Sequence, residues 1–477
     1  MSEALSNDSR FPGRYFRWVA TMLSLALLSA CTVGPDYVRP VQETGLAYKA
    51  EKVDGWVQAR PGDDLSKGNW WERFNEPVLN DLMKQLNASN QSIVQAVARY
   101  DAARALTAQA RSGFFPVLGS GAGYDRSGGS NRSGTSQYDL SGSLNWELDL
   151  WGKVRRQVQG QEAAQQASAA DLANVRLSMQ SELARNYFNL RMIDEHKRLL
   201  ERTLQAYERS LRMNRNRYAQ GVSARGDVVA AMAQVNNARA QAIDIEAERA
   251  RTENAIAVLT GQLPSSVNIA PVAFEVKVPA IPVSVPATLL QRRPDVAAAE
   301  RKVAQANADI GVAQSAWFPD LKLNLSGGLQ AATFSDWISS PLNFWSLGPA
   351  LAMTLLDGGA RAANINYAKA SYQAEVAGYR QTVLTALQEV EDAISTLGVL
   401  NREIKVQQQA LAASRESLQI TRNQFEAGLI DYLSVVQVET AAYSAERTAL
   451  QLENQRLNTT VDLIKALGGG WSESLTP

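Results

Sequence analysis

The chain has 477 residues, and its 48 basic and 48 acidic side chains give a formal net charge of zero. This balance gives no electrostatic reason to expect nucleic acid or a strongly anionic surface as a partner. A single cysteine excludes an internal disulfide framework. The single histidine, His196, has no metal-type ligands near it in the sequence, so we expect a solvated or interfacial helix residue, no metal and no cofactor.

The first thirty residues have the pattern of an export signal. Arginines at positions 10, 14 and 17 precede an apolar run from Val19 to Leu28, which is followed by Ser29, Ala30 and Cys31. The pattern is similar to the bacterial lipoprotein box, which implies a signal peptide over residues 1–30, cleavage before Cys31 and acylation of its sulfur. Thr32, rather than an aspartate, favours the outer membrane. The alternative is a chance cysteine after an ordinary signal peptide.

The next segment, residues 31–75, is rich in proline, glycine and charge, and carries Trp56, Trp70 and Trp71. We expect an irregular segment that packs against the body of the protein. The spacing of apolar residues then predicts one helix from about Val78 to Arg111, which Phe115-Pro116 ends.

Two strands are predicted after this helix. The first, about Val117 to Arg126, is mostly glycine and serine. In the second, Tyr138 to Leu148, apolar and polar residues alternate, which predicts a strand with one apolar and one polar face. The apolar set is Tyr138, Leu140, Leu144, Trp146 and Leu148, and the polar set is Asp139, Ser141, Ser143, Asn145 and Glu147.

A helix of unusual length follows, from Gly152 to Met213, ending in a turn around Gly221. Its apolar residues recur at steps of three and four, and about sixty residues would extend on the order of 90 Å. Helices that cover an ordinary globular core have three or four turns, so this one must span a long gap. A return helix is predicted from about Gly226 to Thr260.

The second half of the chain repeats this plan after a proline-rich linker. We expect a helix from Ala287 to Ala316, with a restart at Pro294, which Phe318-Pro319 breaks. Two strands, Leu321 to Ala331 and Leu347 to Leu355, come next. Gly358-Gly359 opens a second long helix to about Phe425, and after a turn at Gly428 a return helix runs to Leu467.

The two halves match at a nearly fixed offset. Phe115-Pro116 matches Phe318-Pro319, Gly152 and Arg155 match Gly358 and Arg361, and Gly221 matches Gly428. Such matches indicate a tandem duplication. The predicted segments are an N-terminal anchor (31–75), a first repeat (76–263), a linker (264–286), a second repeat (287–470) and a tail (471–477).

The four strands indicate a membrane location. Strands of about ten residues with one apolar and one polar face are typical of transmembrane β-barrels. Four strands cannot close a barrel, and an open edge in lipid leaves backbone groups unsatisfied, so several chains must share their strands. Three chains would give twelve strands and a water-filled lumen. The alternative is an ordinary half-buried sheet in a soluble protein.

Several motifs resemble the TolC-type outer-membrane factors, in the OprM-like lipoprotein branch that serves resistance–nodulation–division pumps. They are Asn69-Trp70-Trp71 through Phe74, the block from Leu289 to Asp295 with Arg292-Arg293-Pro294-Asp295, Gly311 through Pro319, and Asp357 to Arg361. The resemblance implies a mainly α fold with a trimeric twelve-stranded barrel and a long periplasmic helical barrel. It also implies an equatorial belt that includes the linker and both chain ends.

The same resemblance places the functional residues at the two helix tips, 218–227 and 425–436. It implies docking of a periplasmic adaptor at Gly221, Val222, Gly428 and Leu429. It also implies a gate of inward polar and acidic residues, for which the candidates are Asp431, Arg422, Asp227 and Arg225. Many relatives have a carboxylate one residue earlier, where this chain has Ile430, which leaves the register of the gate open.

No catalytic constellation is visible in the sequence, so we expect no enzyme. Arg292 to Asp295 is interpreted as a helix start, with Pro294 in the first turn and Asp295 complementing the helix dipole. The expected function is a passive exit duct in the outer membrane for substrates handed over by an inner-membrane pump and its adaptor. The alternatives are a lipid-anchored coiled-coil scaffold without a pore, and the exit duct of a metal or secretion exporter.

Overall fold

The computed structural model describes residues 32–41, 68–129, 132–275, 277–279, 293–339 and 342–469. The predicted signal peptide, Cys31, Trp56, Arg292 and the C-terminal tail lie outside these ranges. The chain forms two compact units. The described residues up to 41, from 100 to 168 and from 299 to 379 form one unit, and those from 68 to 99, from 169 to 298 and from 380 to 469 form the other. Each unit therefore draws on both predicted repeats.

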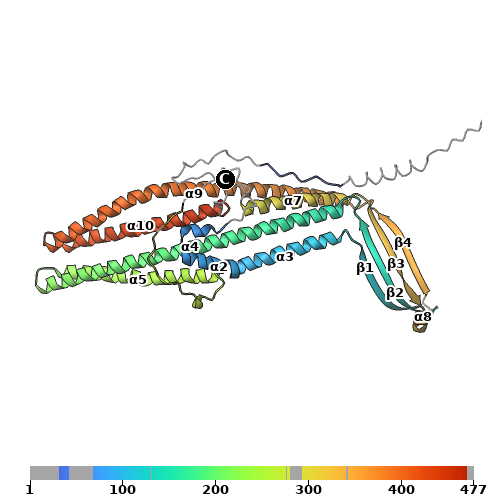
Figure 1. Ribbon diagram of the computed structural model, residues 1–477, viewed down its shortest axis with the longest axis horizontal. Coiled ribbons are helices and arrows are strands. Elements are labelled where there is room, and N and C mark those ends of the chain that lie inside the picture. The colour runs from blue at the N-terminus through green and yellow to red at the C-terminus, as the bar shows by residue number, and fades with distance from the viewer. Residues whose placement is uncertain are drawn as a thin grey trace, which may run out of the picture. The chain divides into compact units, whose positions relative to one another are not determined.

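The predicted long helices are confirmed, and they come in matched pairs (Figure 1). Helices α4 (Lys153–Ala219) and α9 (Ala360–Glu426) both have 67 residues. The return helices α5 (Arg225–Leu259) and α10 (Tyr432–Ala466) both have 35 residues. These equal lengths agree with the tandem duplication. In the part of the chain that is described, no helix is both long and apolar enough to cross a membrane.

The helix predicted from Val78 to Arg111 is wrong in one respect, because it is divided into α2 (Pro77–Ser89) and α3 (Gln91–Ser112). Asn90 between them has an extended backbone conformation with ψ of 122°. Its side-chain oxygen accepts a hydrogen bond from the Ile93 N–H at 3.0 Å, and its side-chain nitrogen donates to the Leu259 carbonyl at 2.7 Å. The break is thus stabilised by an N-cap and by a contact with α5, more than 160 residues away in the chain.

The four predicted strands are confirmed as β1 (Val117–Gly129), β2 (Arg132–Leu148), β3 (Asp320–Ala331) and β4 (Leu342–Ala352). The predicted start of the second strand, Tyr138, and the predicted bounds of the fourth, 347–355, are wrong. The register of β4 is fixed by pairing with β3, whose first residue, Asp320, lies opposite Ala352, so β4 ends where its partner strand begins. The short helix α8 (Phe334–Ser339) between β3 and β4 was not expected from the sequence.

The strands form one antiparallel sheet in the order β1-β2-β3-β4. Its register places polar side chains of neighbouring strands opposite each other, as in Ser143 with Ser326, Asn145 with Asn324, and Glu147 with Lys322. Leu144 and Leu325 share the other face. The predicted division into a polar and an apolar face is therefore present. Within the described residues, β1 and β4 each have one edge that pairs with no other strand.

Helices and sheet are joined by specific polar contacts within the first unit. Asp149 accepts hydrogen bonds from the Val154 and Arg155 N–H groups, both at 3.0 Å, at the start of α4. Asp357 accepts similarly from the Gly359 and Arg361 N–H groups at the start of α9. Carboxylates at these positions satisfy the free N–H groups of a helix start and complement its dipole.

The helix α7 (Pro294–Ser315) starts at Pro294, the predicted restart, and the predicted part of this helix from Ala287 to Arg292 lies outside the described residues. Arg293, just before it, donates to Asp295 at 2.6 Å, to Glu389 at 2.7 Å and to the Ala466 carbonyl at 3.0 Å. Although burial acts in the opposite direction, the Arg293 guanidinium holds the pKa of Asp295 below its ordinary value. This block therefore fixes a helix start.

The largest apolar cluster lies in the second unit. Trp70, Trp71 and Phe74 form the short helix η1 (Trp70–Phe74) and are all at most 4% exposed. Phe74 packs against Phe188 of α4 with ring centroids 4.8 Å apart. The expectation that this segment packs against the body is confirmed for these residues.

Candidate functional site

The two predicted tips have the same backbone geometry. In the first, Gly221 has φ of +73°, its N–H donates to the Tyr218 carbonyl and the Val222 N–H donates to the Arg217 carbonyl. In the second, Gly428 has φ of +76°, and the Gly428 and Leu429 N–H groups repeat the pattern. This is a Schellman turn, in which a glycine takes the left-handed conformation that ends the helix.

The residues predicted for adaptor docking are accessible at these turns. Val222 is 63% exposed and Leu429 is 74% exposed. No heavy atom outside its own neighbours lies within 4 Å of a Cβ built on Gly221. Exposed apolar side chains on rigid turns are suited to contact with another protein.

The four residues predicted for the gate do not meet in one chain. Asp431 is the N-cap of α10, and its carboxylate accepts hydrogen bonds from the Ser434 N–H at 3.0 Å and the Ser434 hydroxyl at 2.6 Å. These bonds hold the pKa of Asp431 below its ordinary value. Asp227 accepts a hydrogen bond from the Ser223 hydroxyl at 2.7 Å, and Arg225 is exposed.

Arg422 binds a residue that was missed in the sequence, Glu439 of α10. The Arg422 guanidinium donates twice to one Glu439 oxygen, at 2.8 and 3.1 Å. Glu439 is 3% exposed, and burial raises its pKa even though Arg422 acts against this. It lies on the buried stripe with Tyr432, Val435 and Ala442. An acid at a buried position of the helical period is the signal that would have found it.

The two tips are packed together within the second unit. Tyr207 and Leu211 of α4 form one apolar cluster with Phe425, Tyr432 and Val435. The Arg217 guanidinium donates to the Phe425 carbonyl at 3.0 Å and lies 4.8 Å from the centre of the Phe425 ring. A movement of one hairpin relative to the other must therefore break these contacts.

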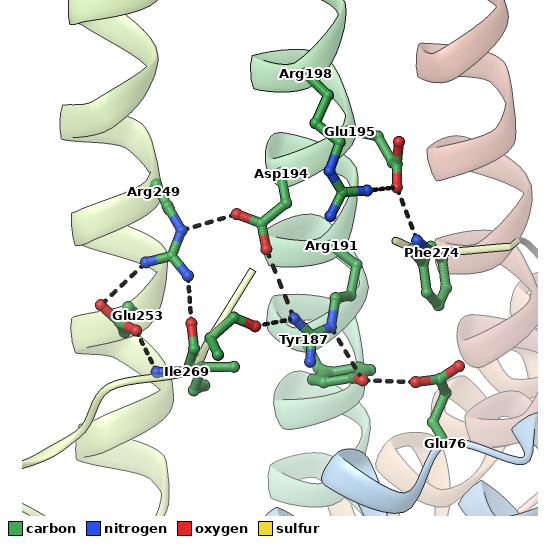
Figure 2. Close-up of polar contacts among 11 residues, drawn as sticks. Glu76, Tyr187, Arg191, Asp194, Glu195, Arg198, Arg249, Glu253, Ile269 and Phe274 are labelled. Atoms are coloured by element: carbon green, nitrogen blue, oxygen red, sulfur yellow. Dashed lines mark hydrogen bonds and ion pairs between the residues drawn. The ribbon is translucent and has the colours of Figure 1, made fainter. Parts of the chain in front are cut away.

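A network of ion pairs and hydrogen bonds, which we call the clasp, is centred on Arg191, Asp194 and Arg249 (Figure 2). Asp194 lies between two guanidinium groups, at 2.8 Å from Arg249 and 3.6 Å from Arg191. The side chains of Arg191 and Asp194 are both 1% exposed. Buried charges of this kind are tolerated only when they are paired and hydrogen-bonded.

The clasp holds the segment that follows α5. Arg191 donates to the Ala270 carbonyl at 2.9 Å, and the Arg249 guanidinium donates to the Ile269 carbonyl. Carboxylates of α5 and α4 accept the N–H groups of the same segment: Glu253 binds Ile269 at 2.6 Å and Glu195 binds Phe274 at 2.7 Å (Figure 2). The beginning of the predicted linker is thereby fixed to the first hairpin.

The clasp extends to the start of α2. The Tyr187 hydroxyl donates to Glu76 at 2.7 Å and accepts from Arg191 at 3.1 Å. Burial and the Glu76 carboxylate raise the pKa of Tyr187 to about 12. At the offset of 207 residues that relates the two tips, the second repeat has Gly398 and Asn401 instead of Arg191 and Asp194. The clasp is a property of the first repeat alone.

His196 is a half-buried residue of α4, and its ring nitrogen lies 3.1 Å from the hydroxyl of Tyr443 in α10. Burial, and then the charge of Arg447, lower its pKa. Among the residues that are described, no group of three or more histidine, cysteine, aspartate or glutamate side chains is arranged to hold a metal ion.

Known proteins are similar to this chain over nearly its whole length. The outer membrane efflux protein family matches residues 82–262 and 285–469. The chain is 27% identical to the toluene efflux pump outer membrane protein TtgF of Pseudomonas putida, over 94% of this chain and 96% of that protein. A matching arrangement of helices and strands is found in the solved structures of two outer-membrane channels.

The outer-membrane channel OprN has a TM-score of 0.85 and 32% identity, over 92% of this chain and 100% of OprN. The open state of the Neisseria gonorrhoeae channel MtrE has a TM-score of 0.82 and 27% identity, over 92% of this chain and 98% of MtrE. These relatives are transport channels, which favours a conduit over a scaffold without a pore. The chain belongs to the outer membrane efflux protein family, and it is an outer-membrane channel component of an efflux system.

Proposed function

We propose that three copies of the chain form one closed exit duct, through which an inner-membrane pump and a periplasmic adaptor release their substrates passively. The observation that carries this proposal is the two-faced, four-stranded sheet with two free edges, from which two pairs of long helices continue. In a lipid bilayer the free edges of β1 and β4 would leave N–H and carbonyl groups without partners. Pairing β4 of one copy with β1 of the next satisfies them and closes a twelve-stranded barrel.

The aromatic side chains at the two ends of the sheet support its placement in a membrane. At one end, Tyr124 and Tyr138 pack with ring centroids 4.7 Å apart, and Phe334 lies 5.8 Å from Tyr138. At the other end, Trp151 stacks on Phe318 at 4.9 Å. Aromatic belts at both ends of an apolar band are typical of strands that cross the outer membrane.

The N-terminal anchor is part of the same proposal. Cys31 itself lies outside the described residues, but the chain after it is fixed beside the start of α4. The Val33 N–H donates to the Trp151 carbonyl at 3.0 Å. The Arg156 side chain, 5% exposed, donates to the Gly34 carbonyl at 3.1 Å and to Asp36 at 3.0 Å. An acylated Cys31 would therefore enter the membrane near the base of the sheet, where it would add to the hold of the barrel.

At the other end of the long helices, the tips are proposed as the gate and the docking surface. The exposed turns at Gly221, Val222, Gly428 and Leu429 would receive the adaptor. Asp431, with Asp227, Arg225 and Arg422 nearby in sequence, would form the polar ring that narrows the closed mouth. The domain bounds predicted from the sequence, with repeats at 76–263 and 287–470, remain part of this proposal.

Cross-linking between strand edges tests the trimer. A variant with Gly119→Cys on β1 and Ser346→Cys on β4 places one thiol on the polar face of each edge strand. Treatment of the membrane-inserted protein with a short bifunctional thiol reagent should give covalent dimers and trimers on denaturing gels.

The matched control carries Ser143→Cys and Ser326→Cys, which lie opposite each other on the two inner strands. It should cross-link only within one chain. Exclusively intrachain products from the edge pair, in protein that is inserted in the membrane, would exclude the shared barrel.

A further inference from the structure

The end of the first hairpin carries positive charge that the chain does not neutralise. Arg209, Arg212 and Arg215 lie on the last turns of α4, and Arg225 begins α5. All four side chains are exposed, and none has a hydrogen bond or ion pair with another part of the described chain. We call these four residues the basic face.

Two acidic groups of the first hairpin, Glu208 and Asp227, already have other partners. Glu208 pairs with Arg239 at 3.1 Å, and Asp227 accepts the Ser223 hydroxyl at 2.7 Å. The remaining arginine of this tip, Arg217, is held by the carbonyl and ring of Phe425. None of the four guanidinium groups forms an ion pair with a carboxylate of the described chain, and their mutual repulsion costs stability unless a partner provides negative charge.

Apolar side chains are interspersed with the basic face. Tyr218 is 48% exposed, Val222 is 63%, Val229 is 50% and Met232 is 42%. On α5, Arg225, Val229 and Met232 follow at steps of four and three, so they lie along one side of the helix. A surface with exposed apolar residues between arginines has the composition of a protein interface.

The second hairpin does not share this property, although its backbone is equivalent. At the offset of 207 residues, Arg209 corresponds to Glu416, Arg212 to Gln419 and Arg225 to Tyr432. Arg215 corresponds to Arg422, whose charge is paired with Glu439. The hairpin fold therefore does not require the basic face, which is particular to the first tip.

We propose that the basic face binds an acidic, amphipathic helical segment of the periplasmic partner. This inference rests on the proposed function, which brings the tips into contact with such a partner. Glutamate and aspartate side chains would pair with the four guanidinium groups, which form charge-assisted hydrogen bonds with carboxylates. The apolar stripe of the same helix would cover Tyr218, Val222 and Met232. A protein is favoured over a lipid surface because the proposed duct places the tips in the periplasm, a 67-residue helix away from the sheet that enters the membrane.

The test uses the purified full-length protein in detergent and two synthetic, disulfide-closed helical hairpins as probes. The hairpins share one apolar stripe and differ only in their flanking residues, which are glutamate in one and lysine in the other. The glutamate hairpin should bind, and more weakly at 300 mM than at 50 mM NaCl, because salt screens exposed charges. The triple variant Arg209→Gln, Arg212→Gln, Arg215→Gln should bind about tenfold more weakly, a few-fold for each exposed ion pair.

Arg176→Gln is the matched control, since Arg176 is exposed on the same helix but is more than thirty residues from Arg209. It should bind as the wild type does. Equal binding by the triple variant, or equal binding of both hairpins, overturns the inference. So does arginine-dependent binding to phosphatidylglycerol vesicles without binding of the glutamate hairpin, because the face would then recognise lipid.

The cross-linking of the Gly119→Cys, Ser346→Cys variant and the conductance of the wild type are measured separately. If that variant does not cross-link into trimers and the wild type does not conduct, the proposed duct fails whatever the result with the hairpins. If it forms a conducting trimer that does not discriminate between the hairpins, only the acidic partner is excluded.

Discussion

At the scale of single residues, the structure shows one ion pair with a buried carboxylate at the tips, where the sequence predicted only a group of candidate gate residues. Arg422, expected near Asp431, instead binds Glu439, which is buried beside Tyr207 and Tyr432. Tyr207 belongs to α4 and Glu439 to α10, so the pair lies at the contact between the two hairpins. A buried carboxylate of this kind makes the stability of the tip depend on pH.

The Glu439→Gln variant should show this dependence. Because burial raises the pKa of Glu439 above 4.5, ionisation is less favourable in the folded protein than in the unfolded chain. The wild type should therefore lose stability as the pH rises from below 4.5 through the raised pKa, and the variant should not. The melting temperatures should coincide at pH 4, whereas at pH 8 the variant should melt higher. Arg422 is about one-third exposed and would turn to solvent.

The exposed Glu416→Gln variant, on the same tip, should follow the wild type at both pH values. A difference between Glu439→Gln and the wild type that is the same at pH 4 and pH 8 would show that packing, and not ionisation, is responsible.

The Asp431→Asn variant separates the two roles of that residue. Asparagine is as good an N-cap as aspartate, so helix α10 should keep its start, whereas the charge is lost. If Asp431 forms the acidic ring of the closed mouth, planar-bilayer conductance should rise, and block by multivalent cations should disappear. If conductance and block are like those of the wild type, Asp431 does not form the gate, and Asp227 and Arg225 are the remaining candidates.

At the scale of elements, the sheet has one face for lipid and one for water. The register confirms that Leu144 and Leu323 lie on the apolar face, and Ser143 and Asn324 on the polar face. The phase was visible in the sequence because side chains alternate along a strand. The bounds of β4 were not visible in the sequence, because a strand ends where its pairing with the neighbouring strand ends.

Arginine scanning should distinguish the two faces. Leu144→Arg or Leu323→Arg should hinder membrane assembly, at a cost of about 2–4 kcal/mol for each chain near the middle of the bilayer. Ser143→Arg or Asn324→Arg should assemble normally and change only the conductance. The measurement is the yield of heat-modifiable, membrane-inserted protein, and equal yields for the two faces would refute the assignment.

At the scale of the whole molecule, the clasp links segments that are far apart in sequence. Helices α2, α4 and α5 and the start of the linker meet through Glu76, Arg191, Asp194 and Arg249. The second repeat has Gly398 and Asn401 in place of Arg191 and Asp194, so the two hairpins are similar in backbone and only the first of them carries the clasp.

Removing the carboxylate of Asp194, the central charge of the clasp, should destabilise the folded protein. Asp194→Ala leaves Arg191 without its carboxylate at a position that is 1% exposed, which should destabilise the protein by about 3–5 kcal/mol. The linker should then be cleaved faster by trypsin, at Lys277. The control Asp462→Ala removes the partner of Arg185 in a pair that is more than 40% exposed, and should cost about 1 kcal/mol or less. Similar trypsin cleavage rates in the two variants would contradict the role of the clasp.

The sequence alone determined the features that have a short period. The two long helices, their return helices, the alternation in β2 and β3 and the glycine turns at Gly221 and Gly428 all follow from spacing within a few residues of the chain. The duplication was equally visible, because it repeats those local signals at a fixed offset. For this reason the order of helices and strands and the position of the tips could be predicted, whereas the trimeric barrel was implied by the family resemblance.

Only the tertiary structure decided which distant residues meet. The break at Asn90 depends on the Leu259 carbonyl, the partner of Arg422 depends on a buried turn of α10, and the clasp joins Arg191 to Ala270. Each of these contacts brings together groups that are separated by about 17 to 170 residues. Burial determines them, since a buried polar group must find a partner wherever the fold provides one, and no local pattern in the sequence indicates which partner that is.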